Sequence, residues 1–170
     1  MLFLRLIICF CIFISCYLIG LLIAKKYINR VIELKEFKNA LNMFKTKIRF
    51  THEPIPELFE QIANSLENNV GNIFRKASNY MKTKTAEYSW KKTLEEKESL
   101  SLTKEDIHVL KNLGKLLGKT DLEGQTNEIA LVETFLEMQI DKAEEEREKN
   151  EKLYKTLGAV FGLVLVIILV

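Results

Sequence analysis

The chain has 170 residues, with 25 basic and 23 acidic side chains, and its formal net charge of +2 gives no reason to expect nucleic-acid binding. Of its residues 48% are hydrophobic, which suggests one domain, but these residues are concentrated at the two ends of the chain. The three cysteines, Cys9, Cys11 and Cys16, all lie in the first apolar run. No disulfide can therefore cross-link the polar middle, which suits a reducing compartment.

The first apolar run extends from Leu6 to Ala24 without a charge. As a helix it reaches about 29 Å, close to the roughly 30 Å hydrocarbon core of a bilayer. The run is longer than the apolar part of a typical signal peptide, no A-x-A cleavage site precedes Lys25, and Phe13 fits poorly into a lipobox ending at Cys16. We therefore expect residues 1–25 to be a retained transmembrane anchor, in which the cysteines pack as small apolar side chains.

The last apolar run, "LGAVFGLVLVIILV", covers residues 157–170 and reaches only about 21 Å as a helix. Its terminal position and its apolar character on every side favour a second transmembrane segment over a buried core helix. Between Lys25 and Arg49, eight basic residues outnumber two acidic ones, a balance of +6. The positive-inside rule then predicts a cytoplasmic domain over residues 26–156, with both termini on the outer side of the membrane.

The middle of the chain has helical periodicity throughout and no strand pattern. The sequence predicts an all-α bundle of about six helices, whose long first and last helices continue into the N-terminal and C-terminal transmembrane segments. Pro54 and Pro56 break the pattern once, and the second of them suits the first turn of a short helix. Apolar spacing predicts the remaining helices around Leu58–Leu66, Val70–Met81, Ala86–Leu94, Thr103–Leu117 and from Gln125 into the last apolar run.

One stretch, "LGKLLGKTD", looks like a phosphate-binding loop because Gly118, Lys119 and Thr120 form a GKT. A P-loop needs four residues between its first glycine and the GK, whereas only three follow Gly114. The preceding segment is predicted to be a helix with a capping box at Thr103 and Asp106, not the buried strand that a P-loop follows. The stretch is therefore interpreted as a corner between two helices, with Gly118 ending one helix and Thr120 capping the next.

The first and last long helices carry opposite charge. Residues 25–49 have a balance of +6, and residues 121–155 hold five basic and eleven acidic residues, a balance of −6. Since both helices emerge from one membrane, ion pairs between them would hold them side by side. The alternative is that the acidic stretch is only a solvated face, because exposed ion pairs contribute about 0–1 kcal/mol each.

Catalysis finds little support in the sequence. His52 and His108 are the only histidines, and the middle of the chain has no cysteine to pair with them. Trp90 and the phenylalanines have the spacing of core residues, and no HExxH, CxxC or EF-hand pattern occurs. We expect no enzymatic activity, no cofactor, no metal and no small-molecule substrate.

Three segments carry a resemblance to a known family: "PIPELFEQIA", "LGKTDLEGQ" and "REKNEKLYKTLGAVFGLVLVIIL". In this order they resemble the stage III sporulation protein AB family of endospore-forming bacteria. The resemblance extends over nearly the whole chain. That family is similar to the cytoplasmic domain of the inner-membrane platform proteins of type II secretion and type IV pilus systems. The resemblance implies a non-enzymatic scaffold in the mother-cell membrane around the forespore, as part of a channel complex with a separate secretion-type ATPase.

The loops of the bundle are the expected partner-facing sites. They contain Pro54 and Pro56, and a corner in which the resemblance places recurring residues at Gly118, Asp121 and Gln125, with Thr120 where a serine-like residue is expected. An alternative from another class is a membrane-anchored helical signalling or receptor module. Such a protein would normally place a sensing domain outside the membrane, whereas the flanking lysines predict a domain inside.

Overall fold

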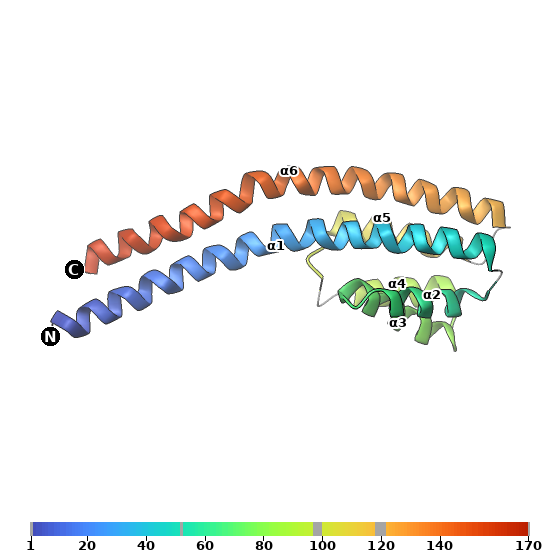
Figure 1. Ribbon diagram of the computed structural model, residues 1–170, viewed down its shortest axis with the longest axis horizontal. Coiled ribbons are helices and arrows are strands. Elements are labelled where there is room, and N and C mark those ends of the chain that lie inside the picture. Colours follow the sequence, from blue (N-terminus) through green and yellow to red (C-terminus); the bar gives the residue numbers. More distant parts are fainter. Residues whose placement is uncertain (1, 52, 97–99, 118–121, 170) are drawn as a thin grey trace. The chain divides into compact units, whose positions relative to one another are not determined.

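The computed structural model describes residues 2–51, 53–96, 100–117 and 122–169. These residues form six helices and no strand, which confirms the all-α prediction (Figure 1). The first and last helices are long and apolar at one end, as expected. The helices are α1 (Leu2–Phe50), α2 (Ile55–Ser65), α3 (Asn69–Met81), α4 (Ala86–Glu95), α5 (Lys104–Leu116) and α6 (Leu122–Leu169).

The chain divides into two compact units. Unit 1 consists of Met1–Val31 and Lys142–Val170, and unit 2 consists of Ile32–Asp141. Both α1 and α6 contribute one part to each unit. The expected boundaries at residues 25 and 157 follow the hydropathy of the chain instead, and they remain predictions.

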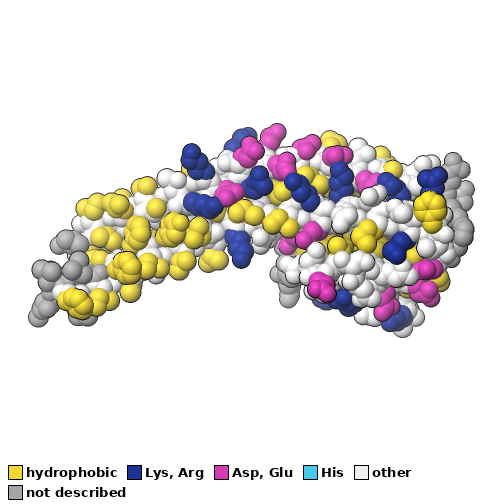
Figure 2. Space-filling model, in the orientation of Figure 1, with side chains coloured by type: hydrophobic (Ala, Val, Ile, Leu, Met, Phe, Trp, Pro, Cys, Tyr) yellow, Lys and Arg dark blue, Asp and Glu magenta, His cyan; other side chains and the backbone are white. Residues whose placement is uncertain are grey.

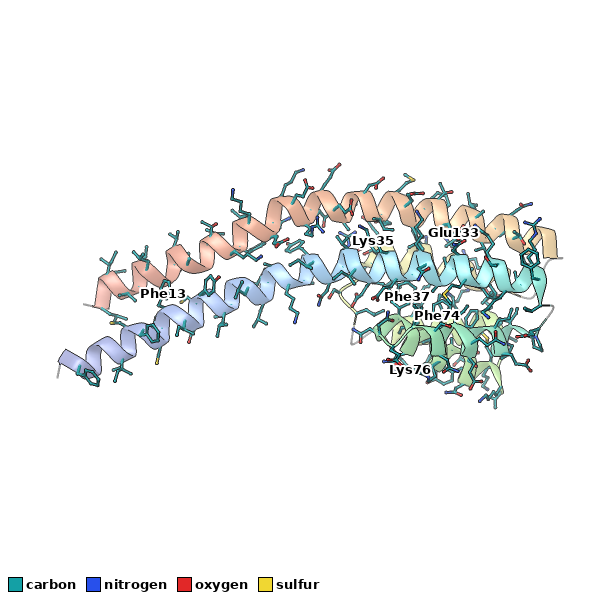
Figure 3. All side chains as sticks on the ribbon, in the orientation of Figure 1. Phe13, Lys35, Phe37, Phe74, Lys76 and Glu133 are labelled. Atoms are coloured by element: carbon teal, nitrogen blue, oxygen red, sulfur yellow. The ribbon has the colours of Figure 1, made fainter. Side chains whose placement is uncertain are left out.

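Unit 2 has an aromatic core that joins four helices. The Phe59 ring of α2 lies 4.9 Å from the Phe74 ring of α3 and 5.6 Å from the Trp90 ring of α4, measured between centroids. From α1, Phe44 packs edge-on against Phe59 at 5.2 Å, and Phe37 lies 6.3 Å from Phe74 (Figure 3). All five side chains are fully buried, so the prediction that they form the core is confirmed.

Short polar residues start three helices of unit 2. The Asn68 side chain accepts a hydrogen bond from the Gly71 amide at the start of α3, and Thr85 does the same for Tyr88 in α4. At the start of α5 the predicted capping box is present. The Asp106 amide donates to Thr103 Oγ1 at 3.2 Å, and the Thr103 amide donates to Asp106 Oδ2 at 2.8 Å. A helix therefore precedes the apparent phosphate loop, as predicted.

The opposite charges of α1 and α6 do form ion pairs. In unit 2, Lys38 Nζ lies 2.7 Å from Glu137 Oε1, and Lys45 pairs with Glu133. In unit 1, Arg30 is 4% exposed and its Nη1 lies 2.7 Å from Glu146 Oε2. The predicted pairing is thus confirmed in both units.

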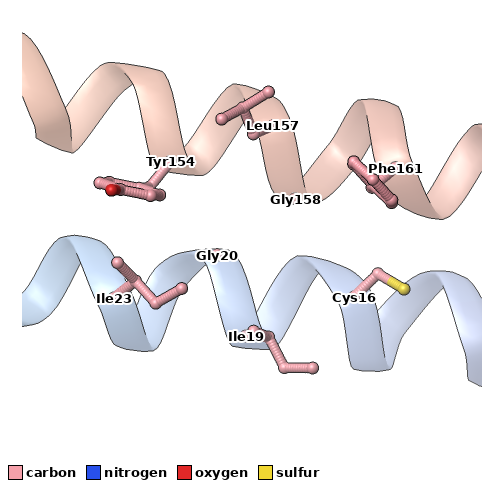
Figure 4. Close-up of a pocket in the computed structure, with 8 residues that line it drawn as sticks. All are labelled: Cys16, Ile19, Gly20, Ile23, Tyr154, Leu157, Gly158 and Phe161. Carbon is pink, nitrogen blue, oxygen red and sulfur yellow. The ribbon is translucent and has the colours of Figure 1, made fainter.

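Unit 1 brings the two apolar segments together at glycines. A Cβ built on Gly20 would lie 2.6 Å from the Tyr154 carbonyl oxygen and 3.1 Å from Gly158 Cα, so the helices approach at a point where neither has a side chain. A small crevice lies at this crossing (Figure 4). Near it, the Tyr27 and Tyr154 rings stack at 5.8 Å between centroids. The segment "GAVFG", residues 158–162, is therefore a GxxxG packing motif, which the sequence analysis did not identify.

Both long helices, α1 and α6, are long and apolar enough to cross a membrane. Windows in α1 and α6 have mean hydropathies of 2.8 and 1.9, and only 17% and 6% of them are buried. A core helix of a soluble domain would be mostly buried, so this exposure favours lipid-facing segments. Figure 2 shows hydrophobic side chains gathered over these segments, with charged side chains over the rest of the chain.

One buried residue was predicted wrongly. Leu66 was expected on the buried side of α2, but α2 ends at Ser65 and Leu66, in extended conformation, is only partly buried. Ala63 is buried in α2 beside Ile62. The helix therefore ends one residue before the predicted limit and begins three residues before it.

Candidate docking end of the helical bundle

Unit 2 has one end at which three connections between helices meet. The described ends of α1, α3 and α5 and the starts of α2, α4 and α6 all lie there, while α2 and α4 end, and α3 and α5 begin, at the other end (Figure 1). We call the first the loop end; it is where α1 ends and α6 begins. The predicted partner-facing residues Pro54 and Pro56 belong to it, as does Gln125 in the first turn of α6.

Side-chain contacts tie the loop end together. Ser78 Oγ, near the end of α3, donates a hydrogen bond of 2.8 Å to the Pro56 carbonyl oxygen in the first turn of α2. Lys47 Nζ donates to Gln61 Oε1 at 2.7 Å, and the Gln61 amide donates to Glu53. The connection after α1 is therefore held by hydrogen bonds to α2.

The loop end exposes aromatic and basic side chains. Phe50, the last residue of α1, is 73% exposed, and Tyr88 in the first turn of α4 is 52% exposed. Arg49 lies 6.0 Å from the centroid of the Phe50 ring, within reach of a cation–π contact. Lys82 and Lys84 line a hollow with Tyr88 at the turn between α3 and α4. Exposed aromatic side chains with arginine beside them are the residue types enriched at the centres of protein interfaces.

The predicted loop residues are only partly described. Pro54 precedes α2 and is exposed, Pro56 lies in the first turn of α2, and Gln125 is half-buried in the first turn of α6. Gly118, Thr120 and Asp121 lie outside the described residues, as does His52. Whether any of these residues contacts a partner stays a prediction.

The turn of Lys82–Thr85, with its sequence "KTKT", belongs to the loop end, but it was not among the predicted partner-facing loops. From the sequence it is only the gap between the helices predicted at Val70–Met81 and Ala86–Leu94. A signal was present, because α3 and α4 are short, consecutive and joined by four residues, so they must fold back as a hairpin. Consecutive helices of a bundle run in opposite directions, so every second connection lies at the same end. The α3–α4 turn is the third connection and therefore belongs to the same end as the first.

The opposite end of unit 2 holds a buried carboxylate. Glu33 of α1 is 5% exposed, and its Oε2 accepts a hydrogen bond of 2.7 Å from the Ser101 amide. Burial raises the pKa of Glu33, while the hydrogen bonds from Ser101 and Asn69 lower it and only partly compensate. Glu33 thus fixes the segment before α5 to α1, which is a structural role.

The described residues offer little for chemistry. No group of three or more His, Cys, Asp or Glu side chains within the described ranges is placed to hold a metal ion. His108 is exposed on α5, in a small hollow with Lys104 and Lys111. The three thiols are free, and they lie in the apolar part of α1.

Taken together, the helices, the buried aromatic core and the two apolar ends define a helical bundle with two candidate membrane-spanning helices. The family model described as stage III sporulation protein AB matches residues 5–170. The chain belongs to this family, and a role in sporulation follows.

Individual relatives agree. Stage III sporulation protein AB of Bacillus subtilis (strain 168) is 33% identical over 153 residues, which cover 88% of this chain and 90% of the relative. A solved structure of stage III sporulation protein AB superposes with a TM-score of 0.66 at 28% identity, covering 71% of this chain and 98% of that one. The expected family is therefore confirmed over most of the chain.

Proposed function

We propose that this protein is a non-enzymatic membrane scaffold of the channel complex between mother cell and forespore, and that it docks a separate secretion-type ATPase. In this proposal the protein lies in the mother-cell membrane around the forespore. Unit 2 is cytoplasmic, and both termini are on the outer side. Other proteins of the complex and the lipid bilayer are its partners.

The observation that carries the proposal is the loop end of unit 2. It presents Phe50 and Tyr88 to solvent, away from the aromatic core and at the end of α1 opposite its apolar segment. Exposed aromatic side chains with a neighbouring arginine are residue types that interfaces favour, and they suit a protein partner. The family resemblance implies a likeness to secretion platform proteins, and this likeness supports an ATPase as that partner.

The charge at the ends of the apolar segments supports the orientation. Lys25 and Lys26 follow the first segment, and Lys152 and Lys155 precede the second. Such residues favour the cytoplasmic side of a membrane. A bundle held by both of its long helices keeps one orientation, which a docking platform needs.

The test uses the full chain carrying an affinity tag in sporulating cells. We expect the secretion-type ATPase to be captured with it, and Phe50→Ser to reduce the captured ATPase at least tenfold, because the exposed ring is lost without touching the core. The matched control is Ile32→Ser. Ile32 is also exposed on α1, at 48%, but at the other end of unit 2.

Two results would count against the proposal. If Phe50→Ser and Ile32→Ser reduce the captured ATPase equally, the loop end is not the docking site. If the unchanged protein captures other membrane proteins of the complex but not the ATPase, the protein does not dock the ATPase.

A further inference from the structure

Unit 2 has an apolar stripe that its own core does not use. Leu131, Phe135 and Met138 of α6 are 49%, 41% and 62% exposed. Their spacing of four and three residues places them on one side of the helix, opposite the buried Ile129, Leu136 and Ile140. We call this surface, with Glu128 and Asp141 at its two ends, the α6 face. Clustered apolar side chains on a charged helix mark a contact surface.

The α6 face has a carboxylate at each of its two ends. Residues 124–141 contain four carboxylates, Glu128, Glu133, Glu137 and Asp141, and no basic residue. Two of these carboxylates are held by Lys45 and Lys38 of α1. Glu128 and Asp141 make no ion pair with the described residues, so their charge is available to a partner.

A second surface has the opposite character. Residues 69–85, which comprise α3 and the turn after it, contain four basic residues and no carboxylate. Arg75, Lys76, Lys82 and Lys84 are all exposed, and Tyr88 follows them. Figure 3 shows Lys76 pointing away from Phe74 and the core. We call this surface the α3 face.

The two faces lie on opposite sides of unit 2. The α1 segment lies between them: it pairs with α6 through Lys38 and Glu137, and it packs on α3 through Phe37 and Phe74. Figure 1 shows α6 on one side of α1 and α2, α3 and α4 on the other. Two complementary faces on opposite sides of one body make a head-to-tail contact that repeats from copy to copy.

We propose that this protein associates with copies of itself, with the α6 face of one copy bound to the α3 face of the next. The stems of Lys76 and Lys82 and the Tyr88 ring would cover the apolar stripe, while the ammonium groups meet Glu128 and Asp141. Such contacts form a row or a ring of copies that share one orientation in the membrane. The inference concerns self-assembly, and it does not depend on ATPase docking.

Pairing of two α6 faces is disfavoured. A contact between two α6 faces whose helices run in the same direction would bring Glu128 against Glu128 and Asp141 against Asp141 of the second copy. Like charges at such positions repel. A head-to-tail contact replaces this repulsion by attraction and keeps both copies anchored from the same side.

The test reverses the charge of each face separately in the full chain, reconstituted in nanodiscs or mild detergent. Variant A carries Glu128→Lys and Asp141→Lys, and variant B carries Lys76→Glu and Lys82→Glu. We expect the unchanged protein to form assemblies of several copies at micromolar concentration by light scattering. Each variant alone should be monomeric, and an equimolar mixture of A and B should assemble again, because each reversed face then meets an oppositely charged one.

The control is Glu57→Lys with Glu60→Lys, which reverses two exposed carboxylates of α2 and should leave assembly unchanged. Far-UV circular dichroism shows whether each variant folds, and the mixture provides a second check, since misfolded chains would not reassemble. If variant B alone still forms dimers, the contact joins two α6 faces and the proposal is wrong. A monomeric unchanged protein, or a mixture that stays monomeric, would also overturn it.

Discussion

At the scale of single residues, Glu33 is a buried carboxylate with a clear role. Its carboxylate accepts the Ser101 amide, so Glu33→Ala would leave that N–H without its partner and should lower the free energy of unfolding by about 1–3 kcal/mol. Glu33→Gln keeps an acceptor oxygen and removes a desolvated charge, and we expect it to be nearly neutral at pH 7. Urea unfolding followed by the fluorescence of Trp90, the single tryptophan, measures both.

The same residue should make stability depend on pH. Burial raises the pKa of Glu33. In a pH range above the ordinary carboxyl pKa, Glu33 therefore keeps its proton in the folded protein but has lost it in the unfolded chain. The unfolding free energy contributed by Glu33 should therefore fall as the pH rises through that range. Subtracting the pH profile of Glu33→Gln from that of the unchanged protein isolates this slope, and a difference of the opposite sign would contradict the assignment.

Trp90 is the second residue whose replacement should change stability by a predictable amount. It is fully buried, and its Nε1 donates to the Leu110 carbonyl oxygen at 2.7 Å, which joins α4 to α5. Trp90→Ala should destabilise unit 2 by about 3–5 kcal/mol, since it opens a cavity among the aromatic rings. Tyr88→Ala on the exposed side of the same helix should cost less than about 1 kcal/mol. Far-UV circular dichroism during urea unfolding compares the two, and equal losses would contradict the aromatic core.

At the scale of elements, helix limits were largely predictable where local chemistry sets them. The capping box at Thr103 and Asp106 needs only four consecutive residues, and Pro54 and Pro56 mark a break by their own geometry. The helix crossing at Gly20 and Gly158 could not be found in the same way, because it depends on two segments more than a hundred residues apart. Each glycine alone is an ordinary residue of an apolar run.

The crossing in unit 1 can be tested by a disulfide. A Cβ built on Gly162 would lie 3.3 Å from Cys16 Cβ, close to the separation that a disulfide requires. With Cys9 and Cys11 replaced by alanine, Gly162→Cys should cross-link to Cys16 within one chain after mild oxidation in membranes. Leu163→Cys, one residue along and 54% exposed, is the matched control and should cross-link far less.

Adding Gly20→Val to the cross-linking protein sharpens this test. Its new Cβ would clash with the Tyr154 carbonyl oxygen, so the helices should separate and the yield of disulfide should fall several-fold. Cross-linking that is equal at positions 162 and 163, or unaffected by Gly20→Val, would show that the glycines do not form the crossing.

At the scale of the whole molecule, the distribution of charge is what the sequence predicted best. The excess of basic residues in α1 and of acidic residues in α6 anticipated the Lys38–Glu137 and Arg30–Glu146 pairs. The exposed stripe on α6 was not anticipated. The phenylalanines were predicted to be core residues, whereas the structure leaves Phe135 of α6 41% exposed and Phe50 of α1 73% exposed.

The central claim is that the protein acts as a scaffold fixed in the membrane by both of its apolar segments. The most direct test deletes residues 157–170 in a strain that carries no other copy and counts heat-resistant spores. Trp90 emission of the purified variant should be unchanged, because unit 2 contains none of the deleted residues. We predict that spore counts fall to those of a strain lacking the protein. Normal sporulation with the deletion would contradict the claim that the second segment is needed.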